Sequence, residues 1–299
     1  MSDLVAVPLI DAPGTLPRTL LRRRVLAHKG LLIGVGLLTL ATFIALLAPL
    51  IAPHDPYAQD LAHRLIPPIW QEKGAWAHVL GTDNLGRDYL SRVLYGARIS
   101  LLIGLAVMVI SGLIGTILGL TAGYFGGRID MAITFITTVR LAMPVILVAL
   151  AVVATIGSSL LVVILVLGLL RWDRFAIVIR AATQQVRALD YVTAAQATGA
   201  STLRIIFGEC FPNILPQLVV IATVEAANAI LLEAALSFLG LGIQPPLPSW
   251  GLMIAEAKQY MFFSFWLIAI PGTALALLVF AINMVGDGIR DVTAPAGRM

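Results

Sequence analysis

Long apolar runs alternate with shorter polar segments along most of this chain. Each run is about as long as the roughly 20 residues that an α-helix needs to cross a bilayer. The pattern therefore predicts an all-α membrane protein with six transmembrane helices. The expected spans are residues 30–52, 99–124, 131–156, 159–182, 214–239 and 263–286.

The composition supports the membrane class. Hydrophobic residues make up 59% of the chain and charged residues 12%, whereas a soluble domain carries about 25% charged residues. The net charge of +4 comes from scattered basic residues, so the expected surroundings are a lipid bilayer and no nucleic acid. The single cysteine, Cys210, excludes an internal disulfide and a cysteine metal cluster.

Basic residues before the first apolar run predict its orientation. Arg22, Arg23, Arg24 and Lys29 precede this run, which places the N-terminus in the cytoplasm. A cleaved signal peptide is the alternative, but the polar leader is long and the run exceeds the usual apolar region of about 7–15 residues. We therefore expect an uncleaved helix, and six spans return the C-terminus to the cytoplasm. The expected division is a cytoplasmic segment 1–29, a first helix 30–52, an external insert 53–96, a five-helix core 97–287 and a cytoplasmic tail 288–299.

One long polar segment, residues 190–213, interrupts the apolar pattern without spanning. Asp190 can cap the start of a short helix, and Gly199 can end it in the left-handed conformation that glycine adopts most easily. Ser201 can cap a second short helix, and Pro212 precedes the next apolar run. The segment predicts a helix, a turn and a helix at the membrane surface.

Four blocks of sequence carry a family resemblance. In residues 190–213, the order of Ala194, Ala195, Gly199, Pro212 and Asn213 resembles the EAA loop of binding-protein-dependent ABC importer permeases. The blocks GTDNLGRDYLSRVLYGARISLLIG, LSFLGLGIQPPLPSWGLMI and MVGDGIRD are similar to the dipeptide, oligopeptide and nickel branch of that family. Together they follow the family's order and spacing over roughly residues 80–291. The resemblance implies the type I permease fold, with residues 97–287 as its core.

The resemblance also implies a function and partners. Such a permease in the bacterial inner membrane forms half of a translocation pathway, and a homologous permease subunit forms the other half. Two ABC ATPase subunits dock on the EAA loops, and an external substrate-binding protein delivers the solute. The expected docking residues are Asp190, Thr193, Ala194, Ala195, Gly199, Ser201, Pro212 and Asn213, although Thr193 stands where the family has the glutamate that names the loop.

Catalytic motifs are missing from the sequence. There is no phosphate-binding loop, and Lys29, Lys73 and Lys258 are the only lysines. The zinc-protease and serine-hydrolase motifs are also missing. We therefore expect no enzyme activity, catalytic residue, metal or cofactor in this chain, and we assign ATP and Mg to the partner ATPases.

Charged residues inside the expected spans mark a candidate pathway, because each costs about 2.5–3.5 kcal/mol at a helix centre. One interpretation is a polar lining that contacts substrate. The other is structural pairing, of Arg140 with an acid such as Glu225 or of either residue with the partner permease. Arg171, Asp173 and Arg174 are expected to snorkel or to line an inner vestibule. The candidate pathway residues are Arg140, Arg174, Glu225, Asn228 and Glu233.

The substrate remains open between several solutes. No cluster of intramembrane His, Cys or Met indicates a metal, so peptides are favoured over nickel chelates, glutathione and opine-like solutes. An ion-coupled secondary carrier that uses Arg140 and Glu225 as a relay is the alternative from another class. Such a carrier is expected to show internal repeats, which the two halves lack, and it leaves the docking loop unexplained.

Four glycines in the second expected span stand mostly four residues apart. They are Gly112, Gly115, Gly119 and Gly123. Small residues at this spacing let two helices approach closely in a membrane. We expect them to serve packing and no chemistry.

Overall fold

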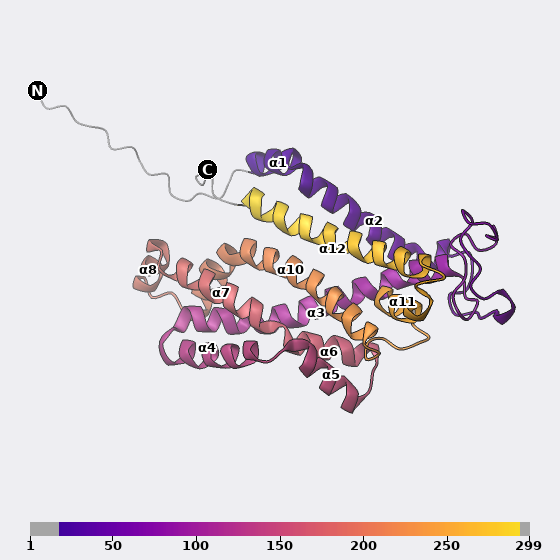
Figure 1. The fold of residues 1–299 in the computed structure, drawn as a ribbon. Helices are drawn as coiled ribbons and strands as arrows, with labels where there is room; N and C mark the ends of the chain where they lie inside the picture. The colour runs from indigo at the N-terminus through magenta and orange to yellow at the C-terminus, as the bar shows by residue number, and fades with distance from the viewer. Residues whose placement is uncertain (1–17, 294–299) are drawn as a thin grey trace, which may run out of the picture.

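The computed structural model describes residues 18–293, and their regular structure is helical apart from one isolated bridge between Thr82 and Asp88. Long helices run side by side, with the short helix α8 at one end and the polar insert at the other (Figure 1). Residues 1–17 of the expected N-terminal segment and residues 294–299 of the expected tail lie outside the described residues.

The first expected span is confirmed as α2, Lys29–Ile51, which follows the short helix α1, Arg18–Ala27. The two are separated at His28, whose imidazole accepts a hydrogen bond from the backbone N–H of Leu31 at 3.0 Å. The last span is α12, Trp266–Thr293, which packs against α2. Gly34 makes this contact close, because a Cβ there would lie 2.8 Å from the Cβ of Met284.

The second expected span begins earlier than the apolar pattern indicates. Helix α3 covers Tyr89–Phe125 instead of starting near residue 99. The carboxylate of Asp88 caps it by accepting a hydrogen bond from the backbone N–H of Ser91 at 2.8 Å. The insert therefore ends at residue 88, and its expected last residues form the polar first turns of α3.

Two expected spans are broken. Helices α4, Gly127–Ala142, and α5, Val145–Ile156, meet at a bend of 79°. Pro144 explains this break, because proline lacks an N–H and disfavours the helical conformation of the residue before it. The span expected at 159–182 is divided at Arg171 into α6, Leu160–Leu170, and α7, Trp172–Arg187.

By length and composition, four helices of the described residues can cross a membrane, or five if α4 and α5 form one span. Helices α6 and α7 have 11 and 16 residues, so neither is long enough to be counted as a span by itself. The chain is thus a multi-pass helical membrane protein. The count of six spans stays a prediction.

The polar segment after α7 forms a hairpin. It consists of α8, Asp190–Ala197, and α9, Thr202–Ile205. Pro212, which precedes the next apolar run, does not interrupt the helices, because α9 continues through a π turn, η2, Ile206–Cys210, into α10, Phe211–Phe238. Short elements that the sequence analysis did not predict are η1, Leu61–His63, α11, Trp250–Ala257, and η3, Lys258–Tyr260.

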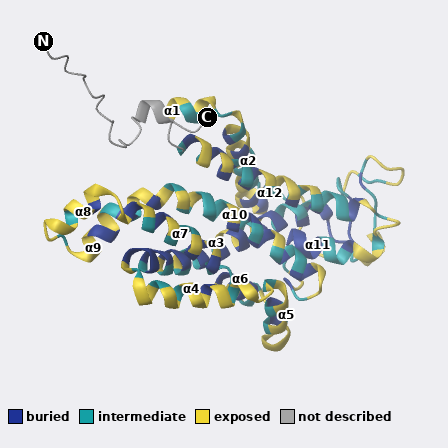
Figure 2. Cartoon of the chain, turned by 60° about the vertical axis from the view of Figure 1, so that its left-hand side comes forward, coloured by how far each residue is buried: buried dark blue, intermediate teal, exposed yellow. Residues whose placement is uncertain are grey.

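Helix α3 lies at the centre and contacts α2, α6, α7 and α10. Figure 2 shows buried residues along α3 and α11, whereas α4 and α8 are largely exposed. The expected role of the glycines is confirmed against α7. A Cβ at Gly115, Gly119 or Gly123 would lie 2.3, 2.8 or 2.7 Å from a backbone oxygen of that helix.

Candidate functional site

Gly199 ends α8 as expected. Its φ of +79° is left-handed, and the N–H of the next residue, Ala200, donates a hydrogen bond to the carbonyl of Ala195 at 3.0 Å. The N–H of Gly199 also donates to the carbonyl of Gln196 at 3.0 Å. These two bonds form a Schellman motif, which turns the chain sharply between α8 and α9.

The two expected helix caps have different outcomes. Ser201 is confirmed as the cap of α9, because its hydroxyl accepts a hydrogen bond from the backbone N–H of Arg204 at 3.4 Å. The prediction for Asp190 is wrong, since Leu189 occupies the cap position without a side-chain bond. Asp190 is instead the first residue of α8, where its negative charge is favoured by the helix dipole.

The hairpin rests on a hydrophobic cluster. Val192 of α8 and Ile205 of α9 are buried with residues of α3, α7 and α10. Burial also raises the pKa of Tyr191, with further contributions from Cys210 and Glu209, so this phenol is neutral near pH 7. The hairpin is therefore packed against the ends of three long helices.

The outer surface of the hairpin is exposed. The expected residues Thr193, Ala194 and Gly199 lie on it, whereas Ala195 is half-buried. Leu203 was not predicted and leaves 68% of its surface exposed. Leu203 is thus a large apolar side chain that the hairpin presents to its surroundings.

Pro212 and Asn213 lie in the first turn of α10, away from the turn at Gly199. Both are exposed, and the Asn213 side-chain amide donates a hydrogen bond to the carbonyl of Glu209 at 2.7 Å. Pro212 has no N–H to donate, and the preceding π turn is one way in which a helix accommodates such a gap.

A polar pocket opens between α7 and α10. It has a volume of about 510 Å³ and contains Arg171, Arg174, Glu225 and Asn228 in its lining. Arg171 Nε donates to Glu225 Oε2 at 2.8 Å, and the Asn228 amide lies 3.5 Å from Glu225 Oε1. Three of the expected pathway residues, Arg174, Glu225 and Asn228, are therefore brought together.

Of the two interpretations left open for Arg140, the structure does not show its pairing with Glu225. Glu225 pairs with Arg171, and the guanidinium of Arg140 donates to the carbonyls of Leu170 and, at 3.3 Å, Met143. These carbonyls lie at the ends of α6 and α4, where the helix breaks leave backbone groups without intrahelical partners. Arg140 thus satisfies the backbone of two broken spans.

Glu233 lies outside the polar pocket. Its side chain is fully buried, and Oε1 accepts hydrogen bonds from the hydroxyls of Ser237 at 2.7 Å and Ser249 at 2.9 Å. Ser249 caps α11, so Glu233 connects α10 to the start of that helix. The contact is close, because a Cβ at Gly251 would lie 3.0 Å from Glu233 Oε2.

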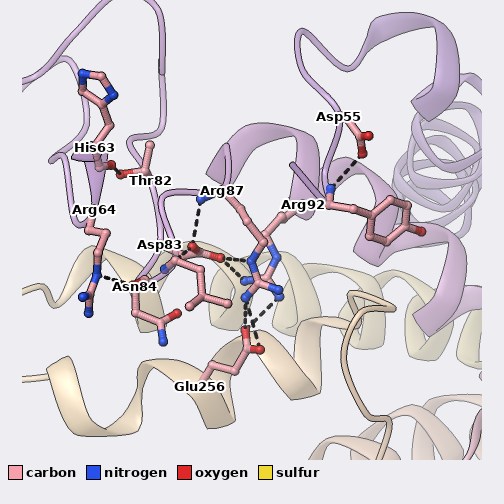
Figure 3. Close-up of polar contacts among 11 residues, drawn as sticks. Asp55, His63, Arg64, Thr82, Asp83, Asn84, Arg87, Arg92 and Glu256 are labelled. Carbon is pink, nitrogen blue, oxygen red and sulfur yellow. Dashed lines mark hydrogen bonds and ion pairs between the residues drawn. The ribbon is translucent and has the colours of Figure 1, made fainter. Parts of the chain in front are cut away.

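A network of four charges joins the insert to the helices (Figure 3). Asp83 pairs with Arg87 at 2.6 Å and with Arg92 of α3. Both arginines reach Glu256 of α11, at 3.3 Å from Arg87 and 2.8 Å from Arg92. The two arginines and two acids balance in charge and fix the insert against α3 and α11.

Several of these charge pairs could not be predicted from the sequence. Asp83, Arg87 and Arg92 belong to one of the quoted blocks, but nothing there indicates contact with Glu256, more than 160 positions away. Leu203 carried a usable signal, because it stands in the first turn after the capping residue Ser201, inside the segment that was expected to dock.

The described helices define a multi-pass helical membrane protein, and comparison with protein families gives its class. Residues 115–298 match the model of the binding-protein-dependent transport system inner membrane component. Residues 17–68 match the N-terminal transmembrane domain of oligopeptide transport permease C. The chain belongs to the family of binding-protein-dependent transport system inner membrane components.

Individual relatives are similar over most of their length. A di/tripeptide transport system permease protein DppC of Pseudomonas aeruginosa is 44% identical over 268 residues, covering 90% of this chain and 88% of the relative. The dipeptide transport system permease protein DppC of Haemophilus influenzae is 41% identical, with coverage of 90% and 91%. A peptide transport system permease protein of Brucella abortus is 40% identical over 301 residues.

A solved structure shares the fold. One chain of the inward-facing MetNI methionine ABC transporter aligns with this protein with a TM-score of 0.56 and 18% sequence identity. The alignment covers 68% of this chain and 97% of that chain. At this identity the likeness supports the fold class, which is the type I ABC importer permease fold expected from the sequence.

Proposed function

We propose that this chain is the permease subunit of an ATP-driven ABC importer and forms half of a translocation pathway for peptides. Membership of the binding-protein-dependent transport family carries the proposal, and the relatives named as peptide permeases support the substrate class. The chain supplies the pathway and no catalytic group. A homologous permease supplies the other half, and an external binding protein delivers the solute.

The hairpin of α8 and α9 is the docking element for an ABC ATPase subunit, two of which serve the permease pair. Its exposed outer surface on a packed base supports this role, because such an element can be gripped and moved as a unit. The docking residues are those expected from the sequence, with Leu203 added. ATP and Mg belong to the ATPase subunits.

The proposed location is the bacterial inner membrane, with both termini and the hairpin in the cytoplasm and the insert outside. The separation of α8 from the insert along the long helices supports opposite sides for the two (Figure 1), and the basic residues before α2 favour the cytoplasm for the N-terminus. The insert would then meet the binding protein, and its fixation by Asp83, Arg92 and Glu256 gives that protein a rigid platform.

The polar pocket between α7 and α10 is a candidate segment of the pathway. A peptide carries a carboxylate at one end, and the pocket has a positive charge that can contact it. Arg174 is exposed and forms no ion pair with any other described residue, whereas Glu225 is paired with Arg171. Arg174 is thus the proposed contact for the peptide carboxylate.

A substitution at Gly199 tests the docking role. Gly199→Val forces a β-branched residue into the left-handed conformation, at a cost of at least about 1–2 kcal/mol. A Cβ there meets no atom within 4 Å, so the effect comes from the backbone and not from a clash. We expect reduced recovery of ATPase subunits with the purified permease, or transport that is uncoupled from ATP hydrolysis.

Two further variants make the experiment decisive. Gly208→Ala is the matched control, because a Cβ at Gly208 also meets open space but the backbone there is helical. Leu203→Glu charges the exposed contact surface while leaving the turn intact. Full assembly and coupling in both Gly199→Val and Leu203→Glu would contradict docking through this hairpin.

The substrate class has its own test. Mass spectrometry of ligands retained by the cognate binding protein should identify peptides, and proteoliposomes holding the full importer should take up the same peptides when ATP is supplied. Recovery of nickel chelates, glutathione or opine-like solutes instead would replace the substrate while leaving the importer intact. Uptake by this chain alone, driven by an ion gradient, would favour a secondary carrier.

A further inference from the structure

Three potential metal ligands converge where the insert meets the long helices. His54 lies just after the end of α2, His78 lies in the insert, and Asp88 is the residue that caps α3. His78 Nδ1 is 2.9 Å from Asp88 Oδ1, and His54 Nδ1 is 3.6 Å from the same oxygen. The three ligand atoms all lie within 4.8 Å of one another.

Ser91 holds this cluster in place. Its hydroxyl and its backbone N–H donate to Asp88 Oδ2 at 2.7 and 2.8 Å, which leaves Oδ1 directed at the two imidazoles. The backbone N–H of His54 donates to the same hydroxyl at 3.1 Å. Hydrogen bonds that orient a ligating carboxylate in this way are typical of the outer shell of metal sites.

The geometry points to a site for a divalent transition metal of the zinc class, which we propose is bound by His54 Nδ1, His78 Nδ1 and Asp88 Oδ1. Zinc takes imidazole nitrogen and carboxylate oxygen at about 2.0–2.2 Å, which separates ligands in a tetrahedral site by about 3.3 Å. The observed 2.9 and 3.6 Å separations bracket that value. The two imidazole rings face the carboxylate together, with their centroids 4.8 Å apart.

The three ligands differ in exposure to solvent, as suits an ion that exchanges with solution. The Asp88 side chain is 1% exposed, so its charge is poorly solvated, and a cation would compensate it. The His54 side chain is 43% exposed, which gives an ion access and lets this ring adjust. A solvent molecule would complete the four ligands, as in zinc sites with three protein ligands.

A bound ion would join three separate segments of the chain. It would link the end of α2, the insert and the start of α3, next to the charged network of Asp83 and Arg92. Because the ion binds the folded arrangement, it would raise the melting temperature in proportion to the logarithm of its free concentration. The proposal stands apart from the transport function and is tested without it.

The test measures Zn²⁺ binding to the purified full chain in detergent after chelation, by isothermal titration and by elemental analysis. We expect one equivalent in the parent protein and at least about tenfold weaker binding in His54→Gln and His78→Gln, because loss of an outer-shell group alone costs about 10–100-fold. His63→Gln is the matched control. His63 pairs with Asp60 at 2.6 Å in the same insert but belongs to no group of three potential ligands among the described residues.

Co²⁺ supplies a second measurement, since four-coordinate Co²⁺ absorbs strongly in the visible range. The band should appear in the parent protein and in His63→Gln and be lost in His54→Gln. His54 is the exposed ligand, so its replacement leaves the buried residues in place, and unchanged gel-filtration and circular-dichroism profiles confirm that the variant is folded. Absence of stoichiometric Zn²⁺ binding, or equal binding in the folded His54→Gln and parent proteins, would show that the cluster is only hydrogen-bonded.

Discussion

A buried ion pair lies in the wall of the polar pocket. The side chain of Glu225 is 4% exposed and that of Arg171 is 13% exposed, so each shields the other's charge from an apolar surrounding. Asn228 adds a third polar group to the same carboxylate. Pairing lowers the free-energy cost of placing these two charges inside the membrane.

Removal of one partner should therefore destabilise the protein. Arg171→Leu leaves a buried, unpaired carboxylate, which costs about 3–5 kcal/mol in such sites. We expect lower abundance in the membrane and a lower melting temperature in detergent. The double variant Arg171→Leu with Glu225→Leu should recover much of both.

Arg140 provides the matched comparison for that experiment. Because Arg140 bonds backbone carbonyls and not Glu225, Glu225→Leu should not rescue Arg140→Leu. Rescue of the Arg140 variant, or failure to rescue the Arg171 variant, would contradict the assignment of the pair.

Arg174 should behave in the opposite way. It lines the same pocket but is exposed, so Arg174→Gln removes no buried partner. We expect near-normal abundance and melting temperature together with slower peptide uptake in proteoliposomes. Unchanged uptake would remove Arg174 from the proposed pathway.

Some features of the site could be predicted from the sequence and others could not. Gly199 and Ser201 were predictable, because turns and caps depend on a few neighbouring residues. The partners of Arg140 and Glu225 were not, because distant pairing depends on where α4, α6 and α7 break. Once Pro144 and Arg171 divide the spans, each arginine faces a different set of acceptors.

At the scale of elements, glycines determine how closely α3 and α7 pack. Gly119→Ala would place its Cβ 2.8 Å from the carbonyl oxygen of Ala176, which forces the two helices apart. Overpacking of this kind costs about 1–3 kcal/mol. We expect a lower melting temperature by fluorescence-detected gel filtration.

Gly36 supplies the control for this packing. A Cβ at Gly36 in α2 meets no atom within 4 Å, so Gly36→Ala adds helix propensity without a clash. It should leave the melting temperature unchanged or slightly raised. Equal destabilisation by the two variants would mean that the close approach of α3 and α7 is not the cause.

Apolar periodicity located the long helices but not their joints. Helices α2, α10 and α12 lie close to their expected positions, since each is a continuous apolar run. The start of α3 and the continuation of α9 into α10 were missed, because both contain polar residues that interrupt the apolar pattern. Tertiary contacts decide whether such residues are helical. Helix α11 was missed because its eight residues are too short to show a period.

At the scale of the whole molecule, the orientation of the chain in the membrane determines which partners each end can meet. The insert and the hairpin lie at opposite ends of the long helices, so a membrane crossed by these helices separates them (Figure 1). Docking to ATPases and contact with a binding protein then occur on different sides. A labelling experiment decides which side each faces.

Single cysteines at exposed positions make that experiment direct. In a Cys210→Ala background, Glu72→Cys in the insert should react with a membrane-impermeant maleimide in spheroplasts, which expose the outer surface of the inner membrane. Thr198→Cys in the hairpin should react only after the membrane is opened. Both labelled positions are exposed in the fold, so their reactivity reports the side of the membrane and not local burial. The native Cys210 is buried, and its replacement removes the one other thiol. Outside labelling of Thr198→Cys with protection of Glu72→Cys would reverse the proposed orientation, and labelling of both would mean that the helices do not separate the two ends.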